Sequence, residues 1–153
     1  MPDAARFHHP LRLFAAAAIA AASAISFIGC ASAPPPPSVL PTAFSQLPTH
    51  LLASMGEHVV EFQCPTPGYQ PSLTRSLDEH LGKGVYITLR SPDPAVNYPQ
   101  RLVTQRIATG VPITTTLNVY VRLIPFDAPD DTDAPFAIAA SAPGTVPVPQ
   151  PPT

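Results

Sequence analysis

A strict alternation of apolar and polar residues from Ile113 to Ile124 is the clearest pattern in the chain. One face carries Ile113, Thr115, Leu117, Val119, Val121 and Leu123. The other face carries Thr114, Thr116, Asn118, Tyr120 and Arg122. Because successive side chains of a strand point to opposite faces, this period of two predicts a long antiparallel strand with one buried and one solvated face.

Three shorter patterns predict further strands. They cover His58–Cys64, Val85–Arg90 and Arg101–Ala108, each rich in β-branched residues or alternating in polarity. Glycine and proline stand between them, as expected for turns and loops. The sequence therefore predicts about four strands in the middle of the chain.

Leucines recur at every fourth position of the segment Ser72–Leu81 and form a stripe if the segment is helical. Pro71 precedes the segment and Gly82 follows it, in the places where helices begin and end. We therefore predict a helix over Ser72–Leu81, and a weaker one over Thr42–Met55 on the same kind of pattern.

The order of these elements is helix, strand, helix and then three strands. It predicts one small α+β domain over residues 42–126, in which one or two helices cover one face of a small antiparallel sheet. A domain of this size has a modest hydrophobic core.

Proline-rich ends flank the predicted domain. Residues 30–41 include the run Pro34–Pro37, which favours an extended spacer reaching roughly 30–35 Å at ~3.1 Å per residue. Residues 127–153 begin with aspartates and continue rich in proline and alanine, which predicts a mostly disordered tail. Within that tail, Phe136 and Ile138 suggest one short edge strand.

The first 29 residues have the three parts of an export signal. A basic start with Arg6 and Arg12 precedes an apolar run from Leu13 to Ile28, which is shorter than the ~20 residues of a membrane-spanning helix. This favours a removable leader. Two alternatives stay open: cleavage after the small residues Ala31–Ala33 with plain secretion, and an uncleaved anchor.

The leader ends in Phe27, Ile28, Gly29 and Cys30, which resembles the lipobox of bacterial lipoproteins. That resemblance implies attachment of a diacylglycerol to the sulfur of Cys30, cleavage before Cys30, and acylation of the α-amino group so freed by a chain such as palmitate. Several acyl chains hold a protein at a membrane permanently. Because Ala31 follows the cysteine, the resemblance implies the outer membrane, with the domain facing the periplasm.

Charge and cysteine content narrow the function further. The formal net charge is −2, without a basic patch, which argues against binding nucleic acid. A lipid on Cys30 leaves Cys64 without an intramolecular partner. The position of Cys64 after an apolar strand favours a buried thiol, and an intermolecular disulfide is the alternative.

The sequence carries no motif for catalysis, for a cofactor other than the lipid, or for metal binding. It has no nucleophile elbow, phosphate loop or dinucleotide fingerprint. His58 lies between Glu57 and Glu61, but alternation along a strand separates such ligands, so we interpret it as a surface histidine. The acidic residues from Asp127 to Asp133 lack the spacing of a calcium loop.

One pattern resembles the TrbH-type conjugal-transfer lipoproteins. It consists of Phe62, a turn, Tyr69, the leucine stripe, Gly84 and Val85. The resemblance implies a structural protein without catalytic residues, in a conjugation or type IV secretion apparatus. The longer spacing from Leu77 to Gly84 and the proline-rich segments depart from that pattern.

We therefore predict a non-enzymatic interaction component of the cell envelope. The predicted strand from Ile113 to Ile124 would offer its edge to an envelope protein, with Thr114, Thr116, Tyr120 and Arg122 flanking the contact. The alternative is a periplasmic carrier of a small or lipidic ligand held between helix and sheet. A protease-inhibitor loop over residues 110–114 is a third interpretation.

Overall fold

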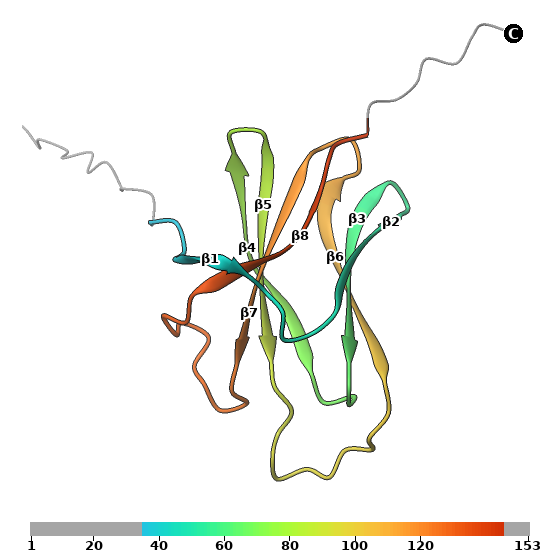
Figure 1. Cartoon of the computed structure of the whole chain (residues 1–153), viewed down its shortest axis with the longest axis vertical. Coiled ribbons are helices and arrows are strands. Elements are labelled where there is room, and N and C mark those ends of the chain that lie inside the picture. The colour runs from blue at the N-terminus through green and yellow to red at the C-terminus, as the bar shows by residue number, and fades with distance from the viewer. Residues whose placement is uncertain (1–34, 146–153) are drawn as a thin grey trace, which may run out of the picture. The chain divides into compact units, whose positions relative to one another are not determined.

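The computed structural model describes residues 35–145, and these residues form two β-sheets packed face to face (Figure 1). The strands are β1 Val39–Ala43, β2 Thr49–Ser54, β3 Glu57–Cys64, β4 Gln70–Glu79, β5 Gly82–Arg90, β6 Val103–Pro112, β7 Leu117–Ile124 and β8 Phe136–Ala142. The larger sheet, sheet A, has the order β1-β8-β7-β5-β4, and sheet B has the order β2-β3-β6.

The predicted α+β class is wrong, because both predicted helices are strands or turns and residues 35–145 contain no helix. Ser72–Leu81 forms most of β4 and the turn after it. A spacing of four also returns to the same face of a strand, so the leucine pattern suits both structures. Pairing with β5 decides between them, and it leaves Leu73 and Leu81 exposed at 44% and 79%.

The predicted helix over Thr42–Met55 is divided between two strands of different sheets. β1 ends at Ala43, and β2 begins at Thr49, just after Pro48. Met55 and Gly56 have positive φ angles of 52° and 83°, so they form the tight turn that joins β2 to β3. Glycine is favoured there because this turn type needs left-handed backbone, and it does not end a helix.

The strand predictions are confirmed for three segments and in part for the fourth. β3, β5 and β6 overlap the predicted strands closely. The long alternating segment begins its strand only at Leu117, because residues 113–116 form the turn by which the chain crosses from sheet B to sheet A. The face containing Leu117, Val119 and Val121 is buried, as the alternation predicts.

The structure has two sheets instead of the single antiparallel sheet that we predicted, and one of them contains parallel pairs. In sheet A, β5 runs parallel to β7, and β1 runs parallel to β8. After β5 the chain leaves sheet A, runs back through β6 of sheet B, and returns as β7 in the original direction. This crossing makes the β5–β7 pair parallel without a helix.

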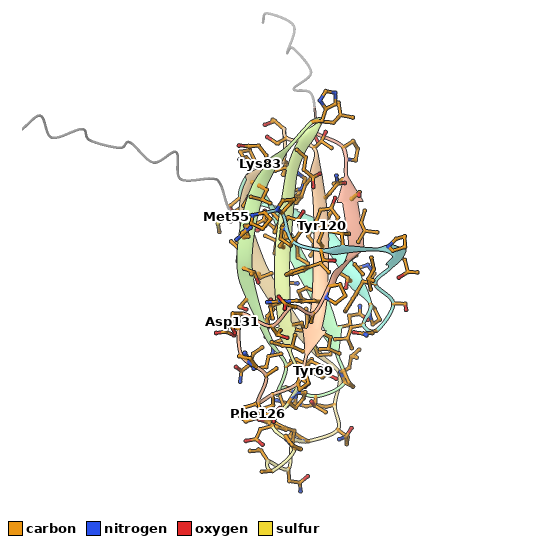
Figure 2. All side chains as sticks on the ribbon, turned by 90° about the vertical axis from the view of Figure 1, so that its left-hand side faces the viewer. Met55, Tyr69, Lys83, Tyr120, Phe126 and Asp131 are labelled. Atoms are coloured by element: carbon orange, nitrogen blue, oxygen red, sulfur yellow. The ribbon has the colours of Figure 1, made fainter. Side chains whose placement is uncertain are left out.

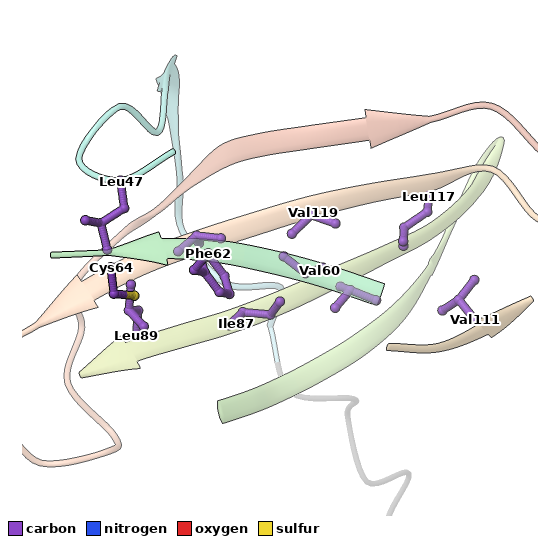
Figure 3. Close-up of a cluster of buried hydrophobic side chains, with 11 residues drawn as sticks. Leu47, Val60, Phe62, Cys64, Ile87, Leu89, Val111, Leu117 and Val119 are labelled. Carbon is purple, nitrogen blue, oxygen red and sulfur yellow. The ribbon is translucent and has the colours of Figure 1, made fainter. Parts of the chain in front are cut away.

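The core lies between the two sheets. Its residues come from both inner faces and from the β1–β2 loop, and most of them are shown in Figure 3. They are Leu47, Val60, Phe62, Cys64, Val85, Ile87, Leu89, Val111, Leu117, Val119 and Val121. Alternating apolar residues of two packed sheets fill this space without helices.

The segment predicted to be a disordered tail contributes a central strand. β8 pairs with β7 on one side and with β1 on the other, so it is not the edge strand that we predicted. Phe136 is only 3% exposed and Ala137 is buried beside it. Two apolar residues at the start of β8 therefore decide its place, in spite of the prolines and aspartates around it.

The leader and the lipobox, residues 1–30, lie outside the described residues, so the lipoprotein interpretation stays a prediction. Residues 35–145 contain no helix long and apolar enough to cross a membrane.

Candidate functional site: a hollow on the outer face of sheet A

The outer face of sheet A carries the polar half of the alternating pattern. In the parallel pair, Tyr86 of β5 lies beside Tyr120 of β7, and Thr88 lies beside Arg122. Paired residues of neighbouring strands share a face, so these four side chains lie opposite the core. Figure 2 looks onto this face and shows Tyr120 on its strand.

Three aromatic rings pack together on this face. The rings of Tyr86 and Tyr120 stack with centroids 4.8 Å apart and planes inclined by 16°. Phe136 of β8 meets Tyr86 edge-on, with 5.2 Å between centroids. Such contacts contribute roughly 0.5–1.5 kcal/mol each beyond buried area. The cluster joins β5, β7 and β8, and we call these three rings the floor of this face.

Arg122 is buried in this floor at 6% exposure and fixes the loop that follows β7. Its Nε donates to Thr88 Oγ1 at 2.9 Å, and its Nη2 donates to the carbonyl of Asp130 at 2.8 Å. Its Nη1 donates to the carbonyls of Thr132 and Ala134. Burial lowers the pKa of Arg122, and the nearby carboxylate of Asp130 opposes that shift.

A second arginine holds the first half of the same loop. Nη1 of Arg90 donates to the carbonyls of Phe126 and Ala128 at 2.7 and 2.6 Å. Its Nη2 forms an ion pair with Asp130. These hydrogen bonds tie residues 125–134, which include two prolines and four aspartates, to sheet A.

A hollow of about 490 Å³ lies between this loop, the floor and the segment before β1. Its lining comes from three parts of the chain that are distant in sequence. The lining residues are Pro35, Pro36, Pro37, Ser38, Thr74, Arg75, Arg122, Asp130, Asp131, Thr132, Asp133, Ala134 and Phe136. Figure 2 shows Asp131 at this side of the sheet.

A carboxylate network occupies another part of the same face. Asn118 donates to Glu79 Oε2 at 2.7 Å, and Ser141 donates to Asn118 at 2.7 Å. Burial, together with a hydrogen bond and charge from Glu79, raises the pKa of Tyr120 to about 12. The raised pKa keeps the phenol protonated to a higher pH than that of an ordinary tyrosine.

Gly84 makes room for this network. A Cβ at position 84 would overlap the carboxylate of Glu79 and lie 3.2 Å from Cε2 of Tyr120. A Cβ here would push the Glu79 carboxylate aside, so the glycine permits the close approach of this side chain across the β4–β5 pair.

The structure brings together two of the four predicted contact residues. Tyr120 and Arg122 lie on the outer face, whereas Thr114 and Thr116 lie in the turn before β7. The prediction that this strand offers a free edge to a partner is wrong, because β7 is hydrogen-bonded to β5 on one side and to β8 on the other. Arg122 is moreover buried, so it shapes the loop from below. Contact of these residues with a partner stays a prediction.

No protein-family model, curated protein or solved structure matches this chain. What the hollow binds therefore follows from its own residues. Arg75, the three prolines and the aspartate loop were missed in the sequence because they are separated by long stretches of chain. The presence of Phe136 inside a polar segment was the one pattern that pointed to order there.

The remaining candidates are structural. His58 is 5% exposed, and its Nε2 lies 3.0 Å from the carbonyl of Thr115, so the surface-histidine interpretation is wrong. Cys64 is buried at the end of β3, as predicted, and burial raises the pKa of its thiol. Within the described residues, no three His, Cys, Asp or Glu side chains are grouped to hold a metal ion.

Proposed function

We propose that this protein is a lipid-anchored envelope protein whose β-sandwich is a non-enzymatic interaction module. Acyl chains on Cys30 would hold it at a membrane, most simply the outer membrane, with the domain in the periplasm. The observation that carries the proposal is the hollow on sheet A, which we take as the site that binds an envelope protein.

The stiffness of the hollow supports this role. Its aspartate loop is held by Arg90 and Arg122, and Phe136 in its lining packs edge-on against Tyr86. A surface that is already ordered loses little conformational freedom on binding, so more of the contact energy appears as affinity. The exposed carboxylates of Asp131 and Asp133 supply polar groups for recognition.

The carrier alternative is less well supported. It required a ligand between helix and sheet, and residues 35–145 contain no helix. The space between the two sheets is occupied by fully buried side chains such as Phe62, Ile87 and Leu117. Tight packing of this kind leaves no room for a lipid without unfolding the core.

Only the TrbH-type resemblance indicates the process in which the partner acts. We propose a conjugation or type IV secretion apparatus on that basis. The proposed role needs no catalytic residue, metal ion or cofactor beyond the covalent lipid on Cys30.

Affinity purification of the tagged protein from detergent-solubilised envelopes tests the proposal. We expect an envelope protein to co-purify with the native chain, and at least fivefold less of it with Asp131→Arg. Asp127→Arg, in the same loop but outside the lining of the hollow, is the control with the same change of charge. Cys30→Ser should lose palmitate labelling. Equal recovery with all variants contradicts the role of the hollow, and palmitate on Cys30→Ser contradicts the anchor.

A further inference from the structure

The segment just after the proposed lipid anchor is bound to the domain. Nη1 of Arg75 donates to the carbonyl of Pro35 at 3.2 Å, and the backbone N–H of Phe136 donates to the carbonyl of Ser38 at 2.9 Å. β1 then continues along β8, and the N–H of Phe44 donates to the carbonyl of Ile138 at 2.7 Å. Residues from Pro35 onward, which were expected to belong to a free spacer, thus contact the domain.

This attachment shortens the tether. Four residues, Ala31 to Pro34, separate Cys30 from Pro35. A chain spans at most ~3.3–3.6 Å per residue, so the covalent limit from Cys30 to Pro35 is about 18 Å. Were the segment detached up to Phe44, the same limit would be about 50 Å. The earlier expectation of a 30–35 Å spacer is therefore wrong for the bound segment.

The short tether restricts where the hollow can be. Pro35 lines the hollow, so the rim of the hollow stays within about 18 Å of the lipid-bearing cysteine, whichever way the domain turns. A soluble partner gains nothing from this restriction. A partner whose binding segment adjoins the membrane meets the hollow at a raised local concentration.

The charge of the rim selects the chemistry of that segment. Asp130 is paired with Arg90, but within residues 35–145 neither Asp131 nor Asp133 takes part in an ion pair. Both are exposed, whereas Arg75 is half-buried and bonded to Pro35. The accessible charge of the rim is therefore negative and complements basic side chains.

We propose that the hollow binds an extended, basic segment next to the membrane-spanning part of an integral membrane protein. This proposal rests on the proposed function, because it needs the lipid on Cys30. It adds the class of the partner and the layer in which the two meet.

Site-specific photo-cross-linking in cells tests the proposal. Benzoylphenylalanine replaces Pro36, an exposed residue of the hollow, or Met55, a fully exposed control residue in the turn of sheet B. We expect Pro36 to cross-link to a peptide within about ten residues of a membrane-spanning segment, by the reach of the tether. Asp131→Asn with Asp133→Asn should reduce the yield, because the basic side chains lose their partners.

Lengthening the tether provides the decisive comparison. A ten-residue Gly/Ser insertion between Pro34 and Pro35 lies outside the strands of the domain and triples the covalent limit between Cys30 and Pro35. Local concentration falls as about the −3/2 power of tether length, so the cross-link yield should fall about fivefold. The same insertion after Thr153 is the control and should leave the yield unchanged.

Each other outcome overturns one of the two proposals. Cross-links from Pro36 to a soluble protein, or a yield that does not respond to the insertion, overturn the membrane-proximal site and leave the anchor intact. Cross-links from Met55 alone overturn the hollow as the binding surface. Loss of palmitate labelling in the native chain, or the absence of adducts at both positions, overturns the proposed function itself.

Discussion

The guanidinium carbon of Arg122 lies 4.7 Å from the centroid of the Phe136 ring, across the β7–β8 pair. The cation and the ring attract each other at this distance, and burial strengthens the attraction. The same guanidinium binds carbonyls of the loop between the two residues. One side chain therefore holds both the loop and the strand that follows it.

Arg122→Met should destabilise the domain strongly. The methionine keeps the apolar stem but removes every donor, so carbonyls of the loop and Thr88 lose their partners. Unpaired buried groups are costly, and we expect a loss of about 3 kcal/mol in the free energy of unfolding. Urea denaturation followed by circular dichroism measures it.

Arg106→Met is the matched control. The Arg106 side chain is 65% exposed and bonds only to Glu61, so its loss should cost less than about 1 kcal/mol. Similar losses for the two variants would show that Arg122 does not hold the loop.

Gly84→Ala should displace the Glu79 carboxylate and disturb its hydrogen bond to Asn118. We expect a cost of about 1–2 kcal/mol, as for other overpacked sites. In a Glu79→Ala background the same substitution should cost little, because the space is then empty. A double-mutant cycle by urea denaturation measures the coupling, which should exceed about 1 kcal/mol. Additive effects would place the strain elsewhere.

Tyr120 should ionise late and make stability fall at high pH. Its pKa rises from 10.0 to about 12 on folding, so the folded state favours the neutral phenol. That contribution is fully present below pH 10 and is lost as the pH rises towards 12. The difference in absorbance at ~295 nm between the native chain and Tyr120→Phe follows this ionisation.

Removing the charge of Glu79 gives the control for this titration. Glu79→Gln should move the ionisation of Tyr120 to lower pH, whereas Glu57→Gln on sheet B should not. A tyrosine titration unchanged by Glu79→Gln would contradict the effect of Glu79 on the pKa of Tyr120.

Cys64 should be unreactive in the folded protein. It has no exposed surface, and burial raises the pKa of its thiol, so little thiolate is accessible. In a Cys30→Ser chain, Ellman's reagent should react only after unfolding in urea. Thr104→Cys, at an exposed position of β6, should react at once in the folded state. Rapid reaction of native Cys64 would show that the end of β3 opens.

The strands were predictable where alternation was long or where β-branched residues dominated. The face of β7 that contains Val119 was assigned correctly because a period of two has one interpretation over many residues. The stripe from Leu73 to Leu81 had two interpretations, since a spacing of four fits both a helix and a strand. Only the pairing with β5, a long-range contact, decides between them.

The candidate site was predictable only in part. Tyr120 and Arg122 were placed on the solvated face by their position in the pattern. The burial of Arg122 was not predictable from this pattern, because it depends on the loop that folds over the side chain. Arg75 and Pro35 are 40 residues apart, and no local pattern indicates that they meet.

The pairing of β1 with β8 also affects when the chain can fold relative to its proposed export. β8 lies between β1 and β7, so β1 cannot join sheet A until β8 has been synthesised. Contacts between such distant segments form slowly. For a chain exported as proposed, this topology would delay folding during synthesis. The polypeptide would then remain unfolded while it passes through a translocation channel.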